Sequence, residues 1–79
     1  MTILTQEIFK DAPTWVLSAS IDGDGDGFYH SLTIDQYAPT EDGLYDVTKF
    51  KYGFNWDYEK FSEDLNTDNW RNSAINRIF

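Results

Sequence analysis

The run Asp22-Gly23-Asp24-Gly25-Asp26-Gly27 separates two segments in which apolar and polar residues alternate. The segments are 14–21 and 28–37, and a period of two residues predicts strands with one buried face. If Ile21 pairs with Phe28 across the loop, the other apolar residues also meet in pairs. These pairs are Ala19 with His30, Leu17 with Leu32, and Trp15 with Ile34. The agreement between register and pattern predicts a β-hairpin whose tip carries three carboxylates.

A third strand is expected after the next turn. Residues 38–43 are rich in turn-forming types, and Gly43 suits a positive φ. Residues 44–52 then contain strand-forming types, although the apolar phase changes between Val47 and Phe50. This change of phase predicts either a bulge or a strand shorter than the segment.

Three further segments have helical spacing. Residues 2–10 are interpreted as a short helix, with an edge strand as the alternative. After Gly53 apolar residues recur at i, i+4, i+7 and i+11, and a second apolar stripe follows residues 66–67. The stripes are Phe54, Tyr58, Phe61 and Leu65, and then Trp70, Ala74 and Ile78. The sequence therefore predicts one α+β domain over residues 1–79, a three-stranded antiparallel β-meander packed against helices in the order α-β-β-β-α-α.

The composition limits how this domain is stabilised and where it is found. With 79 residues the chain forms one small core, and six Phe, five Tyr and three Trp supply large buried surfaces. The absence of cysteine excludes disulfides and thiolate metal sites. No basic, apolar leader begins the chain, and no apolar run is long enough to span a membrane. We therefore expect a cytoplasmic protein with no membrane partner.

The formal net charge of −8 belongs to the middle of the chain. Between Lys10 and Lys49 there is no Lys or Arg, whereas five acids and five bases balance from Lys49 onward. Such an acidic segment repels the phosphates of nucleic acids and attracts a cation or a basic protein surface. The charge thus argues against direct nucleic-acid binding.

The acidic loop also matches the start of a calcium-binding loop. The pattern D-x-D-G-D-G supplies oxygen ligands at positions 1, 3 and 5, from Asp22, Asp24 and Asp26, before a glycine turn. The match ends there, because position 9 is His30 and position 12 is Thr33. Aspartate-rich hairpins of integrin-type propeller repeats are more similar, since strands rather than helices flank this loop. Calcium is therefore the alternative ligand, and no other cofactor is expected.

Nothing in the sequence predicts catalysis. His30 is the only imidazole, and the expected register places it on the inner face of the hairpin. A hydrogen-bonded core histidine is the simpler interpretation than a general base. There is no thiol nucleophile, and an acidic glycine loop repels phosphate. We expect a protein that is not an enzyme.

A family resemblance lies over residues 50–65. The chain contains Phe50-Lys51-Tyr52-Gly53-Phe54-Asn55-Trp56-Asp57-Tyr58-Glu59, followed by Phe61 and Asp64-Leu65. This stretch resembles the pattern F-K-x-G-[aromatic]-N-x-[acid]-Y-E … F-x-x-D-[Leu/Met] of small acidic phage anti-CRISPR proteins. Those proteins block a type II CRISPR nuclease with acidic residues, and share the expected α-β-β-β-α-α order. The resemblance implies that Asp57, Glu59, Glu63 and Asp64 contact such a partner. Lys60 departs from the family's run of acids.

Together these features predict a non-enzymatic, phage-type inhibitor whose acidic surface mimics nucleic acid. Its partner would be a basic, nucleic-acid-binding nuclease or defence complex in the host cell. An immunity protein for a basic nuclease toxin belongs to the same physical class, and a surface kept acidic for solubility alone is the simplest alternative. The expected contact residues are Asp22, Asp24, Asp26, Asp35, Glu41, Asp42, Trp56, Asp57, Glu59, Glu63 and Asp64. Trp56 is included because it lies off the apolar stripe, where a tryptophan can anchor an interface.

Overall fold

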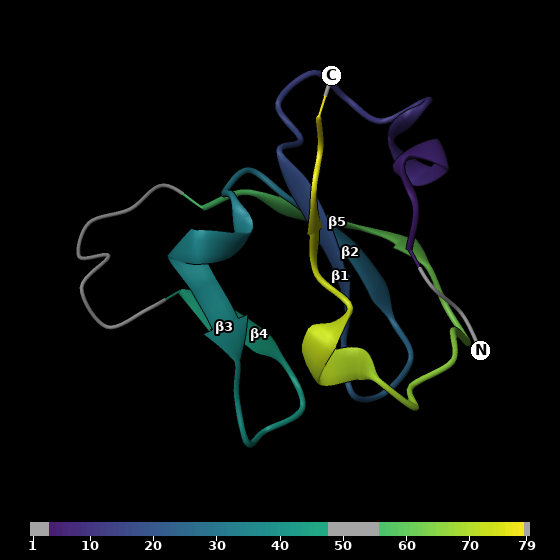
Figure 1. Ribbon diagram of the computed structural model, residues 1–79, viewed down its shortest axis with the longest axis vertical. Helices are drawn as coiled ribbons and strands as arrows, with labels where there is room; N and C mark the ends of the chain where they lie inside the picture. Colours follow the sequence, from purple (N-terminus) through teal and green to yellow (C-terminus); the bar gives the residue numbers. More distant parts are fainter. Residues whose placement is uncertain (1–3, 48–55, 79) are drawn as a thin grey trace.

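Two antiparallel sheets and three short 3-10 helices make up the structure, a computed structural model that describes residues 4–47 and 56–78. The first sheet has the strand order β5-β2-β1-β6, and the second pairs β3 with β4 (Figure 1). The elements are η1 (Gln6–Phe9), β1 (Ser18–Ile21), β2 (Gly27–His30), η2 (Ile34–Gln36), β3 (Tyr37–Pro39), β4 (Tyr45–Val47), β5 (Tyr58–Ser62), η3 (Trp70–Asn72) and β6 (Ile75–Asn76).

The predicted central hairpin forms, but its strands are shorter than 14–21 and 28–37, and its register differs by one residue. Ala19 lies opposite Tyr29 rather than His30, and Ile21 lies opposite Gly27. Gly27 therefore belongs to β2 and not to the loop. A Cβ atom at this position would lie 2.7 Å from side-chain atoms of both Phe61 and Leu65. The close packing of these two side chains explains why glycine begins the strand.

The shifted register gives the sheet two covered faces instead of one. On the first face Ala19 and Ile21 join the cluster of Leu4, Phe9 and Val16. On the second face Ser18 and Ser20 are fully buried and hydrogen-bonded, Ser18 to the Tyr37 hydroxyl and Ser20 to His30. In β1 the polar and the apolar residues are therefore both buried, so their alternation does not distinguish a solvent face from a core face. Trp15, Leu17 and Ile34, predicted to be buried, are exposed by 37%, 43% and 39%.

The helix predicted after Gly53 is wrong in its described part, since 58–62 forms the strand β5. Tyr58 pairs with His30 and Glu59 with Tyr29, so β5 occupies the edge of β2 that the prediction had given to the third strand. The Phe61 ring stacks on Tyr29 with 4.7 Å between centroids. Strand pairing and ring stacking override a spacing that also fits a helix. Phe54, which began the predicted stripe, lies outside the described residues.

The remaining predicted helices are also reduced or replaced. Within residues 4–10, the described part of the first predicted helix, the only helical element is η1, a single 3-10 turn. The predicted C-terminal helix is η3 followed by β6. β6 pairs with β1 at Ala19–Ile75, which completes the first sheet. In the part of the chain that the structure describes no α-helix is present, so the α+β prediction is wrong and the molecule is mostly β-sheet.

The third strand was expected beside the hairpin and instead forms a second sheet. β3 and β4 pair through Tyr37–Val47, Ala38–Asp46 and Pro39–Tyr45. The predicted turn between them is confirmed, with Gly43 at φ 85°. A second cluster of Leu32, Tyr37 and Tyr45 fills the space between this sheet and the serine face of β1. The predicted strand beyond Val47 lies outside the described residues.

Gly27→Ala tests the packing that sets the register. The added methyl group must displace Phe61 and Leu65, so we expect the free energy of unfolding to fall by about 1–3 kcal/mol in urea titration. Adding Phe61→Leu should make the loss in the double variant smaller than the sum of the two single losses, because one collision is removed. Strict additivity would contradict this account.

Candidate functional site

The acidic loop is an ordered turn built by its own backbone. The Asp22 amide donates to the Asp26 carbonyl at 2.8 Å, and the Gly25 amide donates to the Asp22 carbonyl at 3.0 Å. The Asp24 carboxylate accepts a hydrogen bond from the Asp26 amide at 3.2 Å. Gly25 has a φ of 93°, a conformation that residues with a Cβ rarely adopt. These contacts fix the backbone positions from which the three aspartate side chains project.

Two backbone hydrogen bonds join this loop to other acidic segments. The Gly23 amide donates to the Gly43 carbonyl at 2.7 Å, and the Leu65 amide donates to the Gly25 carbonyl at 2.9 Å. The three segments lie together at the lower end of the molecule in Figure 1. We call this region the acidic end. Its carboxylates are Asp22, Asp24, Asp26, Glu41, Asp42, Glu63 and Asp64.

Most of these carboxylates face solvent. Asp24, Glu41, Asp42, Glu63 and Asp64 are exposed, in agreement with a contact surface. Lys60 partly neutralises the acidic end, with its Nζ 3.8 Å from Asp26 and 3.3 Å from Glu63. These two carboxylates raise the pKa of Lys60, which therefore stays charged.

Trp70 lies close both to a second cation and to the acidic loop. The Arg71 guanidinium lies 4.6 Å from the centroid of the Trp70 ring. A Cβ atom at Gly23 would approach the same ring to 3.2 Å.

The other predicted contact acids lie elsewhere. Asp35 is in η2, where it accepts a hydrogen bond from Thr33, and Asp57 donates its amide to the Ser31 hydroxyl at 2.9 Å. Both are beyond the end of β2 that is opposite the acidic loop. Glu59 is exposed in the middle of β5. The structure therefore groups seven of the predicted acids and separates three from them.

Asp22 differs from its neighbours because its side chain is buried, with 4% exposed. Burial, followed by repulsion from Asp24, raises its pKa from 3.8 to about 6. A hydrogen bond from the Tyr45 backbone opposes this shift, and repulsion from Asp26 adds to it. Ionising Asp22 near neutral pH therefore opposes folding. A direct contact between Asp22 and a flat partner surface is inconsistent with this burial.

His30 is buried and neutral. Burial lowers its pKa from 6.5 to about 4. The Trp56 indole N–H donates to its Nδ1 at 3.3 Å, which leaves the ring proton on Nε2, and Nε2 donates to the Ser20 hydroxyl at 2.8 Å. The rings of Trp56 and His30 stack with 5.6 Å between centroids. The interpretation of His30 as a satisfied core residue is consistent with these partners.

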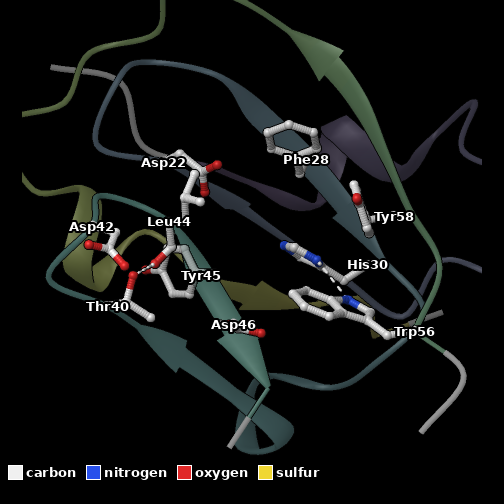
Figure 2. Close-up of a pocket in the computed structure, with 10 residues that line it drawn as sticks. All are labelled: Asp22, Phe28, His30, Thr40, Asp42, Leu44, Tyr45, Asp46, Trp56 and Tyr58. Atoms are coloured by element: carbon white, nitrogen blue, oxygen red, sulfur yellow. Dashed lines mark hydrogen bonds between the residues drawn. The ribbon is translucent and has the colours of Figure 1, made fainter.

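A pocket of about 380 Å³ lies between the two sheets, beside Asp22 (Figure 2). Its lining combines aromatic side chains with carboxylates. The described lining residues are Asp22, Phe28, His30, Thr40, Asp42, Leu44, Tyr45, Asp46, Trp56 and Tyr58. Sequence reasoning named only Asp22, Asp42 and Trp56 among them as contacts. The aromatic content was a signal for the others, but their meeting depends on contacts between distant segments.

A preformed metal centre is not evident. Within residues 4–47 and 56–78 no group of three or more His, Asp or Glu side chains is arranged to hold an ion. In the acidic loop Asp22 is buried and Asp26 lies beside Lys60. Binding of calcium by Asp22, Asp24 and Asp26 stays an untested prediction.

No family model, curated protein or solved structure matches this chain. Among the residues that the structure describes, no helix is long and apolar enough to cross a membrane.

Asp22→Asn tests the cost of the buried carboxylate. Between about pH 4 and pH 6 the folded protein holds more protons at Asp22 than the unfolded chain, so this residue lowers stability as pH rises. One pKa unit corresponds to about 1.4 kcal/mol, so for a shift from 3.8 to about 6 we expect a gain of about 1–3 kcal/mol at neutral pH. Urea titrations across this range should show the gain disappearing below about pH 4.

His30 acts in the opposite direction over a similar range. Its lowered pKa means that stability is lost as pH falls from about 6.5 toward 4. Subtracting the wild-type free energy of unfolding from that of Asp22→Asn at each pH cancels the His30 contribution, which both proteins share. The control Glu7→Gln removes the same unit of charge from an exposed carboxylate on η1, away from the acidic end (Figure 1). A destabilised Asp22→Asn variant at neutral pH would contradict the assignment.

Proposed function

We propose that this protein is a non-enzymatic inhibitor whose acidic end occupies a basic, nucleic-acid-binding surface of another protein. A phage-encoded inhibitor of a host nuclease, such as a CRISPR effector, is the biological setting that we favour. The observation that carries the proposal is the pair of backbone hydrogen bonds, Gly23 to Gly43 and Leu65 to Gly25, which hold three acidic segments together.

The physical argument rests on preorganised charge. A cluster of carboxylates on short, hydrogen-bonded turns requires little ordering when it meets a partner, and it attracts basic surfaces over long distances. A groove that binds nucleic-acid phosphates offers the complementary potential. Charge kept only for solubility requires no such grouping. The clustering of seven carboxylates near one paired lysine therefore favours recognition over solubility alone.

The resemblance to anti-CRISPR proteins supplies the first partner to test. Its implied helix is replaced by β5 at 58–62, and Glu59 lies outside the acidic end, whereas Glu63 and Asp64 lie within it. The described elements do not follow the family's α-β-β-β-α-α order, so the arrangement of charge alone supports this partner. An immunity protein for a basic nuclease would use the same surface.

The triple variant Asp24→Asn, Glu41→Gln, Asp64→Asn removes one exposed charge from each segment of the acidic end. The matched control is Glu7→Gln, Asp11→Asn, Asp35→Asn, which changes the net charge equally from −8 but at other sites. Titration with poly-L-arginine, followed by tryptophan fluorescence, should show about ten-fold weaker binding for the first variant than for the control. Its affinity should also depend less steeply on salt concentration.

The same proteins should be added to a guide-loaded type II CRISPR nuclease, with cleavage of target DNA as the readout. We expect inhibition by the wild type and the control, and reduced inhibition by the acidic-end variant. Equal weakening of both variants would show that net charge alone acts, and would contradict a role for the acidic end.

A further inference from the structure

The pocket between the sheets has two chemically different walls. One wall comes from β2, β5 and the residues before β5, and it carries Phe28, His30, Trp56 and Tyr58. The opposite wall comes from the β3–β4 hairpin, which carries Asp42 and Tyr45, while Asp22 reaches the pocket from the acidic loop. Figure 2 shows the open space between these two groups of side chains.

The first wall is a set of packed rings. Tyr58 meets Phe28 edge-on with 6.0 Å between centroids, and it meets Trp56 at 5.5 Å. Tyr58 is also 62% exposed, although it is a large aromatic residue on an edge strand. The faces of tyrosine and tryptophan rings attract cations, and the attraction is greater where water is partly excluded.

The second wall adds negative charge. Asp22 and Asp42 both line the pocket, and Asp22 is largely shielded from solvent. Among the described lining residues none is Lys or Arg, and His30 is neutral because Trp56 donates to its Nδ1 and burial disfavours its protonation. The described lining therefore combines aromatic rings with carboxylates and contains no Lys or Arg side chain.

We propose that this pocket receives the guanidinium group of an arginine side chain from the basic partner. The inference rests on the proposed function and identifies a specific anchor for it. A guanidinium is planar, stacks on aromatic rings and donates to carboxylates in a fixed geometry, and so suits both walls. The volume of about 380 Å³ lies at the low end for ligand pockets, which fits one extended side chain.

Other ligand classes fit less well. The three lining carboxylates, Asp22, Asp42 and Asp46, disfavour a phosphate or a nucleotide. A metal ion requires several oxygen or nitrogen ligands, and the aromatic wall offers no such set. A lysine ammonium carries the right charge, but it is compact and strongly hydrated, and it lacks the planar face that stacks on a ring.

The test uses N-acetyl-L-arginine amide and the neutral isostere N-acetyl-L-citrulline amide as probes. Binding to the full-length protein is followed at neutral pH by the NMR shift of the Trp56 indole N–H, which identifies the site. We expect saturable binding of the arginine probe, and binding of the citrulline probe weaker by about ten-fold or more. Equal binding of the two probes would overturn the proposal, since charge would then not be recognised.

Three variants locate the binding determinants. Tyr58→Leu should weaken the arginine probe by roughly five-fold, whereas Tyr58→Phe, which keeps the ring, should bind like the wild type. Asp42→Asn should also weaken it, and Glu7→Gln should not. Tyr58 and Asp42 are exposed, so these changes are expected to leave folding intact, as circular dichroism would verify. Unchanged binding in both Tyr58→Leu and Asp42→Asn would overturn the proposal.

The two proposals can fail separately. The acidic-end triple variant retains Asp22, Asp42 and Tyr58, so it should bind the single-arginine probe normally while losing affinity for poly-L-arginine. Loss of poly-L-arginine binding in that variant, together with no preference for arginine over citrulline, would overturn the pocket proposal alone. Normal arginine selectivity with equal poly-L-arginine binding by the triple variant and its control would contradict the acidic end alone.

Discussion

The hydrogen bond from the Gly23 amide to the Gly43 carbonyl connects the two sheets at their turns. The approach is close, because a Cβ atom at Gly23 would lie 3.2 Å from the Gly43 Cα. Contact between backbones therefore constrains Gly23, whereas the positive φ of 85° favours glycine at position 43. The contact places the β3–β4 hairpin over the serine face of β1 and sets Asp22 beside that hairpin. The acidic end and the pocket both depend on this junction, and the acidic end depends also on the hydrogen bond from Leu65 to Gly25.

The arrangement concentrates groups that oppose folding. Like charges on neighbouring turns repel one another, and Asp22 is both buried and close to Asp24. Buried aromatic residues and the hydrogen-bonded serines of β1 offset these terms. A residue that lowers stability and has no packing role can readily be replaced by a more stabilising one. Such residues are typical of functional regions, where activity offsets the lower stability. Asp22 meets this description, since an asparagine retains the shape of the side chain without the charge.

The sequence predicted local features well and long-range features poorly. The hairpin and the turn at Gly43 followed from alternation and turn-forming residues close in sequence. The register failed because Gly27 serves as a strand residue under Phe61, which lies far along the chain. β5 was missed because a few apolar residues at helical spacing also fit a strand when an open sheet edge is present. The acids of the acidic loop and its neighbouring turn were identified from charge alone, whereas Tyr58 and Phe28 became part of a site only through sheet pairing.

Charge and shape serve different purposes at this end of the molecule. A field of carboxylates accelerates encounter with any basic surface, but it discriminates weakly between one such surface and another. A pocket that accepts one planar cation fixes the position of the partner and rejects surfaces that lack a matching side chain. Asp22 and Asp42 belong to both the acidic end and the pocket lining, so the proposed attraction of a basic partner is directed toward the proposed arginine pocket. Selectivity then depends on the ring faces of Trp56 and Tyr58 rather than on additional charge.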